Sequence, residues 1–133
     1  MPARHRDAFA QESGQLVITI DTEEPCLLIY PLSTWLEIEQ KIDALPSFNR
    51  AATRIKRMLI GHATDLELDA AGRMVVPAVL REHADLSKEA VLVGQGKKLE
   101  LWSKPKWADM TQAFIAGEDE DEAWPEALEQ LSL

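Results

Sequence analysis

Residues 68–77 read Leu-Asp-Ala-Ala-Gly-Arg-Met-Val-Val-Pro, and this stretch indicates most about the fold. The Asp69 carboxylate can accept hydrogen bonds from the backbone N–H groups of a turn, and Gly72 permits the positive φ that a tight turn needs. Residues 66–68 alternate like a half-buried strand before this turn, and residues 73–76 return as a second strand. The stretch therefore predicts a β-hairpin with Arg73 at the shoulder of its turn.

Arg73 is the candidate functional side chain of this hairpin. A guanidinium held by a stiff two-stranded segment suits phosphate oxygens or the O6/N7 edge of guanine. The same D-x-x-G spacing is also typical of an ordinary hairpin turn whose arginine is simply solvated. The residues alone leave both interpretations open.

A unit of two strands and a helix follows the hairpin. Pro77 begins a short predicted helix over 78–84, and apolar runs predict strands over 90–93 and 98–102. Ser103 then caps a further helix, whose first turn contains a proline. The second half of the chain therefore contains both structure types, which favours an α+β fold.

The first half of the chain contains the same unit. Residues 15–21 and 26–30 are predicted strands joined by residues 22–25, a plausible hairpin connection. Ser33 or Thr34 is predicted to cap the helix that follows, since Thr34 has a glutamate at capping-box spacing. The order strand, strand, helix thus occurs twice.

Matched residues at nearly constant offsets support a tandem duplication. The motif Leu27-x-Ile29-Tyr30 corresponds to Leu99-x-Leu101-Trp102, and a tryptophan (Trp35 or Trp107) lies five residues beyond each. Further upstream, Pro2-Ala3 followed by Arg6 corresponds to Pro77-Ala78 followed by Arg81. We therefore predict two related β-hairpin and helix units packed as one domain, with helices between them.

The connection between the units is predicted to be a pair of helices. The apolar stripe of the first contains Trp35, Ile38, Ile42 and Leu45, and that of the second contains Phe48, Ala52, Ile55 and Leu59 before a C-cap at Gly61. Arg50, Arg54 and Arg57 share one face of the second helix. This face either contacts phosphates, is solvated, or contacts acidic residues of another subunit.

Charge is distributed unevenly along the 133 residues. The net charge is −9, but residues 118–133 hold seven acids and no base, so residues 1–117 carry 14 − 16 = −2. The acidity therefore does not exclude a nucleic-acid partner for the body of the chain. The acidic segment is predicted to be a solvated tail, or a segment that repels misplaced DNA or occupies a basic site on a neighbouring chain.

Other residue types point away from catalysis. Cys26 is the one cysteine, which excludes an intrachain disulfide and a cysteine-built zinc site, and its apolar run predicts a small buried side chain. His62 and His83 lack the partners of a metal ligand or a base, and no catalytic constellation or nucleotide fingerprint is present. We therefore expect no enzyme, cofactor, metal or small-molecule substrate.

Two further features concern placement. Tyr30 and the repeated tryptophans are expected in the core or an oligomer contact. The longest uncharged stretch, residues 25–36, is too short to span a membrane and no signal peptide opens the chain, which favours a cytoplasmic protein. Arg4-His5-Arg6 either contacts phosphates or frays as part of the terminus.

Taken in order, these motifs resemble the MraZ family of bacterial transcriptional regulators, which belongs to the SpoVT/AbrB-type swapped-hairpin superfamily. The residues that support the resemblance are Pro2-Ala3-Arg4-His5-Arg6, Pro25-Cys26-Leu27-Leu28 to Tyr30-Pro31, Leu59-x-Gly61-His62-Ala63, Leu68-Asp69-x-x-Gly72-Arg73 to Pro77, Arg81 and His83, and Leu99-Glu100-Leu101-Trp102.

The resemblance implies a DNA-binding repressor of its own operon of division and cell-wall genes. It also implies a ring-like homo-oligomer, located at the nucleoid, that presents D-x-x-x-R loops to promoter repeats in double-stranded DNA. Carried onto this chain, the DNA-binding residues are Asp69, Gly72 and Arg73, with the basic positions Arg4, Arg6 and Arg81. The alternatives are an antitoxin-like protein or an oligomeric scaffold that binds a protein and not DNA.

The resemblance also gives the expected organisation. The first SpoVT/AbrB-like repeat covers 1–45, a connecting helix 46–63, the second repeat 64–116 and the acidic tail 117–133. The family has a D-x-x-x-R hairpin upstream of its first P-x-R-x-R motif, whereas this sequence begins at Met1-Pro2. We expect an internal methionine taken as the start, or a shortened gene, with one DNA loop lost and partner strands left with unpaired edges.

Overall fold

Continuous apolar runs in the first predicted hairpin place buried side chains on both faces of a central sheet. The computed structural model describes residues 14–46, 48–69, 74–87 and 89–117, and everything below concerns these residues. Their elements, in chain order, are β1 (Gln15–Ile20), β2 (Leu27–Pro31), α2 (Leu32–Asp43), α3 (Arg50–Leu59), β3 (Thr64–Glu67), α4 (Ala78–His83), β4 (Ala90–Gln95), β5 (Lys98–Ser103) and α5 (Lys104–Ile115). The architecture is α+β, as the sequence predicts.

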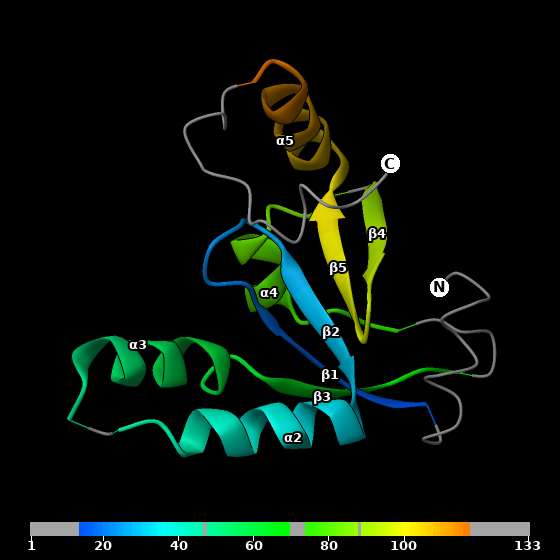
Figure 1. Cartoon of the computed structure of the whole chain (residues 1–133). Helices are drawn as coiled ribbons and strands as arrows, with labels where there is room; N and C mark the ends of the chain where they lie inside the picture. Colours follow the sequence, from blue (N-terminus) through cyan, green and yellow to red (C-terminus); the bar gives the residue numbers. More distant parts are fainter. Residues whose placement is uncertain (1–13, 47, 70–73, 88, 118–133) are drawn as a thin grey trace.

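The five strands form one antiparallel sheet in the order β3-β1-β2-β5-β4, shown in Figure 1. β1 pairs with β2 and β5 pairs with β4 as the two predicted hairpins. β2 and β5 join these hairpins at the centre of the sheet. β3 follows the two connecting helices and pairs with β1 of the first hairpin. A segment distant in the sequence therefore extends the first hairpin by a third strand.

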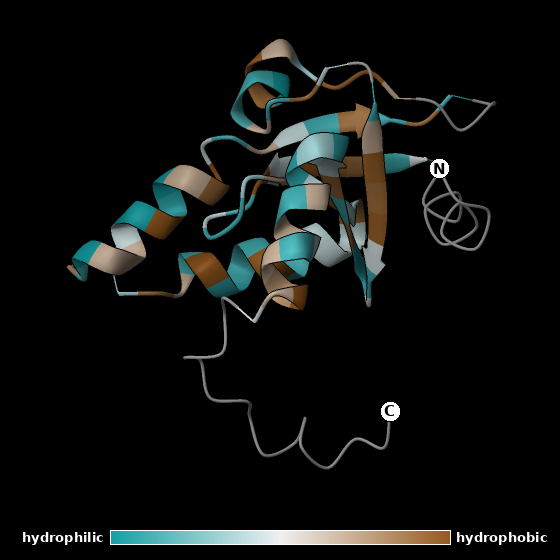
Figure 2. Ribbon diagram, turned by 90° about the horizontal axis from the view of Figure 1, so that it is seen from above, coloured by the Kyte–Doolittle hydropathy of each residue, from teal (hydrophilic) through white to brown (hydrophobic). Residues whose placement is uncertain are grey.

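Helices cover both faces of the sheet. On one face, Leu80 and Ala84 at α4 pack with apolar residues from the two hairpins, among them Ile18 and Leu101. On the other face, α2, α3 and α5 pack around a second cluster that contains Trp102. The strands are accordingly rich in apolar residues, seen as brown ribbon in Figure 2, whereas the helices alternate between apolar and polar. Strands buried on both faces read as continuous apolar runs for this reason.

The register at the centre of the sheet reveals an internal two-fold relation between the repeats. Leu28 pairs with Glu100, and these residues are equivalent in the duplication because 28 + 72 = 100. On either side, Leu27 pairs with Leu101 and Ile29 with Leu99. Such a crossed register is what two copies of one hairpin produce when they meet about a two-fold axis. The duplication read from the sequence thus has a direct structural counterpart.

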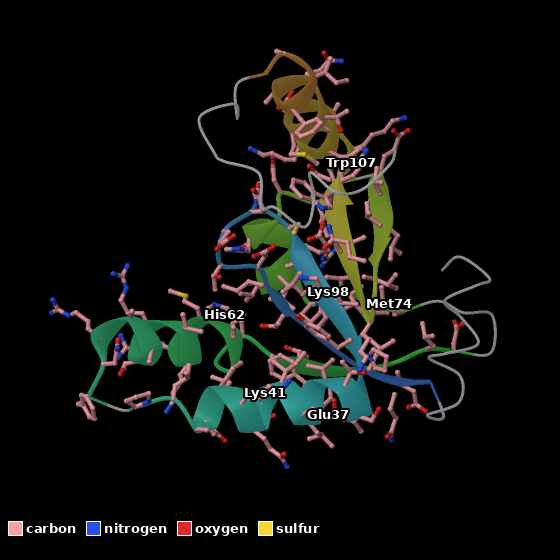
Figure 3. All side chains as sticks on the ribbon, viewed as in Figure 1. Glu37, Lys41, His62, Met74, Lys98 and Trp107 are labelled. Atoms are coloured by element: carbon pink, nitrogen blue, oxygen red, sulfur yellow. The ribbon has the colours of Figure 1, made fainter. Side chains whose placement is uncertain are left out.

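The aromatic residues repeat in space as well. The ring centroids of Tyr30 and Trp35 lie 5.8 Å apart, and those of Trp102 and Trp107 lie 5.6 Å apart. Both pairs pack on the same face of the sheet, with Trp107 reaching from α5 toward β5 in Figure 3. Stacking distances in this range are typical of stabilising aromatic pairs. The prediction that these side chains lie in the core or in an oligomer contact is confirmed by the core positions of Tyr30, Trp35 and Trp102, against which the partly buried Trp107 packs.

The beginning of α2, the first connecting helix, differs from the sequence prediction. α2 begins at Leu32 with Pro31 at its N-cap and no side-chain cap, so neither Ser33 nor Thr34 caps it. The fixed φ of Pro31, −58°, already suits the entry to a helix, and the chain turns directly from β2 into α2. By contrast, Ser103 caps α5 as predicted, since its Oγ accepts from the N–H of Lys106 at 3.2 Å.

The second connecting helix is shorter than predicted. α3 begins at Arg50, because the Asn49 side chain accepts from the N–H of Ala52 at 3.2 Å and caps it. Phe48 therefore precedes the helix and is 92% exposed, so its predicted place in the apolar stripe is wrong. Gly61 follows the helix as predicted, and a Cβ there would collide with the carbonyl oxygen of Arg57. This close approach explains the glycine.

Candidate nucleic-acid interface

The chain on both sides of residues 70–73 is anchored to the sheet. Before them, the N–H of Leu68 donates to the carbonyl of Gly14 at 2.9 Å, which ties the end of β3 to the start of β1. Gly14 has a φ of +71°, and a Cβ there would lie 3.2 Å from the Leu68 carbonyl oxygen. After them, Met74 and Val76 pack against the cluster shared with α4. Figure 3 labels Met74 where the chain re-enters the described domain.

The segment is nevertheless not the hairpin that the sequence predicts. Residues 74–76 lie outside any strand, and β3 pairs with β1 rather than with them. β1 offers β3 a four-residue antiparallel register, from Gln15 with Glu67 to Ile18 with Thr64. The return segment is held by side-chain packing of Met74 and Val76 instead. The prediction of a self-contained two-stranded finger is therefore wrong for the described residues.

The predicted DNA-binding residues divide into two groups. Asp69 is exposed at the last described position before residues 70–73, and Arg81 is exposed on α4. Arg81 lies beside the buried Leu80, which packs α4 onto the sheet and leaves its neighbour in solvent. Gly72, Arg73, Arg4 and Arg6 lie outside the described residues.

The three arginines of α3 gather on one surface, as their spacing predicts. Arg50, Arg54 and Arg57 line a hollow of about 520 Å³ together with Thr53. None of the three arginines forms an ion pair with a described residue. Lys56 is used differently, because its Nζ donates to the carbonyls of Asp43 at 3.4 Å and Leu45 at 3.1 Å and so holds α3 against the end of α2.

A polar cluster that the sequence reading missed lies at the turn of the first hairpin. Asp21, Cys26 and Glu100 bring potential ligand atoms within 4.8 Å of one another. The thiol of Cys26 donates to Asp21 Oδ2 at 3.5 Å, and Trp102 Nε1 donates to Glu100 Oε1 at 3.1 Å. The signal was present in the alternation of residues 99–102, which places Glu100 and Trp102 on the same face of β5.

This cluster is chemically a hydrogen-bonded core site. Burial raises the pKa of the Cys26 thiol far above its ordinary value, and the carboxylates of Glu100 and Asp21 raise it further. Burial, with the same two carboxylates, also raises the pKa of Tyr30. Metal binding and nucleophilic chemistry both require a thiolate, which this environment disfavours. The predicted burial of Cys26 is confirmed, since its side chain is fully enclosed.

The two described histidines lie closer together than the sequence indicates. The rings of His62 and His83 have centroids 6.5 Å apart, and His62 Nδ1 is 2.8 Å from the carbonyl oxygen of Met58. His62 follows α3 and His83 ends α4, so the pair joins two helices. Among the described residues, neither belongs to a group of three metal-ligand side chains.

Comparison with known proteins bears on this arrangement directly. The model of a family described as "MraZ protein, putative antitoxin-like" matches residues 1–58 and again residues 59–127. This chain belongs to the MraZ family. The double match agrees with the two repeats seen in the sheet.

Several MraZ relatives match along the whole chain. A protein of Coxiella burnetii (strain Dugway 5J108-111), named transcriptional regulator MraZ, is 50% identical over 135 residues, which cover 100% of this chain and 89% of the relative. Proteins of the same name from Legionella pneumophila (strain Corby) and Marinomonas sp. (strain MWYL1) are 47% and 46% identical, with the same coverage. In the described part of this MraZ chain, no helix is long and apolar enough to cross a membrane.

Proposed function

We propose that this chain is a transcriptional regulator that binds double-stranded DNA through the loop from Asp69 to Arg73. The observation that carries the proposal is the anchoring of both ends of this loop, by Leu68 on one side and by Met74 and Val76 on the other. A loop whose ends are fixed to a rigid sheet loses less entropy on binding than a free one. The name of the MraZ relatives, transcriptional regulator, supports the same function.

The chemistry of the loop suits DNA. The guanidinium of Arg73 can donate two parallel hydrogen bonds to guanine O6/N7 or to phosphate, and Gly72 allows the backbone to approach closely. Asp69 stands at the start of the loop, where its carboxylate can order the turn. Arg81, exposed on α4, and the basic residues Arg4 and Arg6 add phosphate contacts.

One loop would bind feebly, because the rest of the chain up to residue 117 carries a net charge of −2. We therefore propose that the protein acts as a ring-like homo-oligomer whose loops face one surface. Several loops on one surface act at high effective concentration and match regularly spaced promoter repeats. The expected target is the promoter of the protein's own operon of division and cell-wall genes. We propose that the protein represses this operon at the nucleoid, in the cytoplasm.

Fluorescence anisotropy with the DNA just upstream of the gene, at several salt concentrations, tests this function. The variant Arg73→Ala should lose roughly 1–3 kcal/mol of binding free energy for each base contact made. Lys41→Ala removes an exposed cation from α2, labelled in Figure 3, and should leave the affinity nearly unchanged.

A light-scattering mass measured on the same samples tests the oligomer. A monomeric mass, or equal DNA affinity of wild type and Arg73→Ala, would contradict the proposed function. If the protein does not bind the DNA at low salt while a protein partner co-purifies, the antitoxin-like or scaffold alternative replaces the proposed DNA-binding function.

A further inference from the structure

The arginines on the surface of α3 form no ion pair with any described residue. α3 carries four cations and no acid, and three of them, Arg50, Arg54 and Arg57, line one hollow without a carboxylate among the described residues. Like charges three or four positions apart on a helix repel one another. A surface of this kind fits an anionic partner.

Apolar side chains border the arginines. Ala51, Ile55 and Met58 line an adjoining groove of about 280 Å³ with Thr22 and Arg54. Ile55 is 38% exposed, Met58 44% and Phe48 92%. Figure 1 shows the α2–α3 pair projecting from the end of the sheet, so that no other described element covers its outer side. The surface therefore suits a partner with both acidic and apolar side chains.

Residues 118–133 of this chain have that composition. They begin with five consecutive acids, Glu118 to Glu122, and contain seven acids and no base. Trp124, Leu128, Leu131 and Leu133 follow the acidic block. A negatively charged segment with apolar residues beside it complements a row of arginines beside an apolar groove.

We propose that α3 of one protomer binds the acidic C-terminal segment, residues 118–133, of a second copy of this chain. Figure 1 shows α5 ending on the side of the domain opposite the α2–α3 pair. Residues 118–122 follow directly on Gly117, and five residues extend by at most about 18 Å from it. A neighbouring protomer can bring this acidic block to α3. The contact would link copies independently of DNA.

Charge exchange between the two surfaces tests this contact. In one full-length variant Arg50, Arg54 and Arg57 become Glu, and in a second the five acids at 118–122 become Lys. Each variant alone places like charges opposite each other, so its light-scattering mass should fall. An equimolar mixture should regain at least half of the lost mass, because each variant then complements the other. Added salt should weaken the association.

The matched control replaces Lys41, Lys97 and Lys106, three exposed lysines elsewhere, with Glu. This control carries the same net charge as the arginine variant, and its mass should equal that of wild type. Circular dichroism verifies the fold of each variant. Failure of the mixture to regain mass, or an equal loss in the control, would overturn the proposal.

A second readout separates the contact from DNA binding. A labelled peptide of residues 117–133 should bind the full-length control at least tenfold more tightly than the variant with Glu at 50, 54 and 57. If the peptide binds both equally while DNA affinity falls only in the arginine variant, α3 is a phosphate-binding surface and the proposal is wrong. Loss of DNA binding in Arg73→Ala has no bearing on this result.

Discussion

The two β-hairpins of the sheet share one plan and differ in their surroundings. β1 and β2 meet β5 and β4 about an internal two-fold axis between Leu28 and Glu100. β1 is flanked by β2 and β3 and is buried along five of its six residues. β4 pairs with β5 alone among the described strands, and none of its residues is fully buried. Equal sequence patterns thus give unequal burial, because neighbours from elsewhere in the chain decide it.

The largest expected effect of this difference concerns a pair of equivalent core residues. Ile18 of β1 pairs with Ile29, and Leu92 of β4 pairs with Leu101, the equivalent of Ile29 since 29 + 72 = 101. Ile18 is fully buried and Leu92 only partly. Ile18→Ala should cost about 2–5 kcal/mol of unfolding free energy, and Leu92→Ala less than about 2 kcal/mol. Urea unfolding measures both, and equal costs would mean that β4 is as well covered as β1.

The next effect concerns the residues at the start of the two central strands, β2 and β5. Cys26 corresponds to Lys98, since 26 + 72 = 98, and only the first hairpin encloses a thiol there. Because folding raises the pKa of Cys26 above its ordinary value of 9.0, the folded state keeps a proton that the unfolded state loses. Stability is therefore complete below about pH 9 and falls above it, by up to about 1.4 kcal/mol per pH unit.

Urea unfolding of wild type and Cys26→Ala between about pH 8 and pH 10 measures this effect. The variant should lose the thiol's contribution to the slope and keep that of Tyr30, whose pKa is raised from 10.0. Parallel curves of unfolding free energy against pH for the two proteins would show that the thiol ionises as readily in the folded chain as in the unfolded one.

The smallest effect concerns the two helix starts. Ser103 and Pro31 are equivalent N-caps, since 31 + 72 = 103, but only Ser103 provides a side-chain cap. Ser103→Ala should destabilise the protein by about 0.5–2 kcal/mol. Thr34→Ala, at the position predicted from sequence to cap α2, should change stability by less than about 0.5 kcal/mol. A larger loss of stability in Thr34→Ala would mean that Thr34 caps α2 through the predicted capping box.

Much of the fold could be predicted from local patterns. The strands around Ile18, Ile29 and Leu101 and the cap at Ser103 follow from periodicity and capping chemistry, and the 72-residue offset implied the duplication. The pairing of β3 with β1 could not be predicted, since antiparallel partners distant in sequence leave no local signal. Residues 73–76 were predicted to pair with the strand before them because a short turn suggests a local hairpin.

The candidate site was predictable in part. Exposure of Arg81 and the common surface of the α3 arginines follow from helical spacing. The Cys26–Asp21 and Trp102–Glu100 hydrogen bonds each lie within one repeat, but the approach of Glu100 to Asp21 and Cys26 requires the two repeats to meet at the two-fold axis. Sequence spacing within one repeat does not encode that meeting. The proposed role of Asp69 and Arg73 rests on the anchoring of the chain on both sides of residues 70–73 and on the chemistry of these two side chains.

The most direct test of that proposal compares binding to the DNA upstream of the gene with binding to a shuffled duplex of equal length. Competition anisotropy in one buffer gives the ratio of the two affinities for wild type and for Arg73→Ala. If the loop reads base edges, wild type should prefer its own DNA at least about tenfold, and the preference should fall toward one in the variant. An unchanged ratio in Arg73→Ala would contradict sequence reading by this loop.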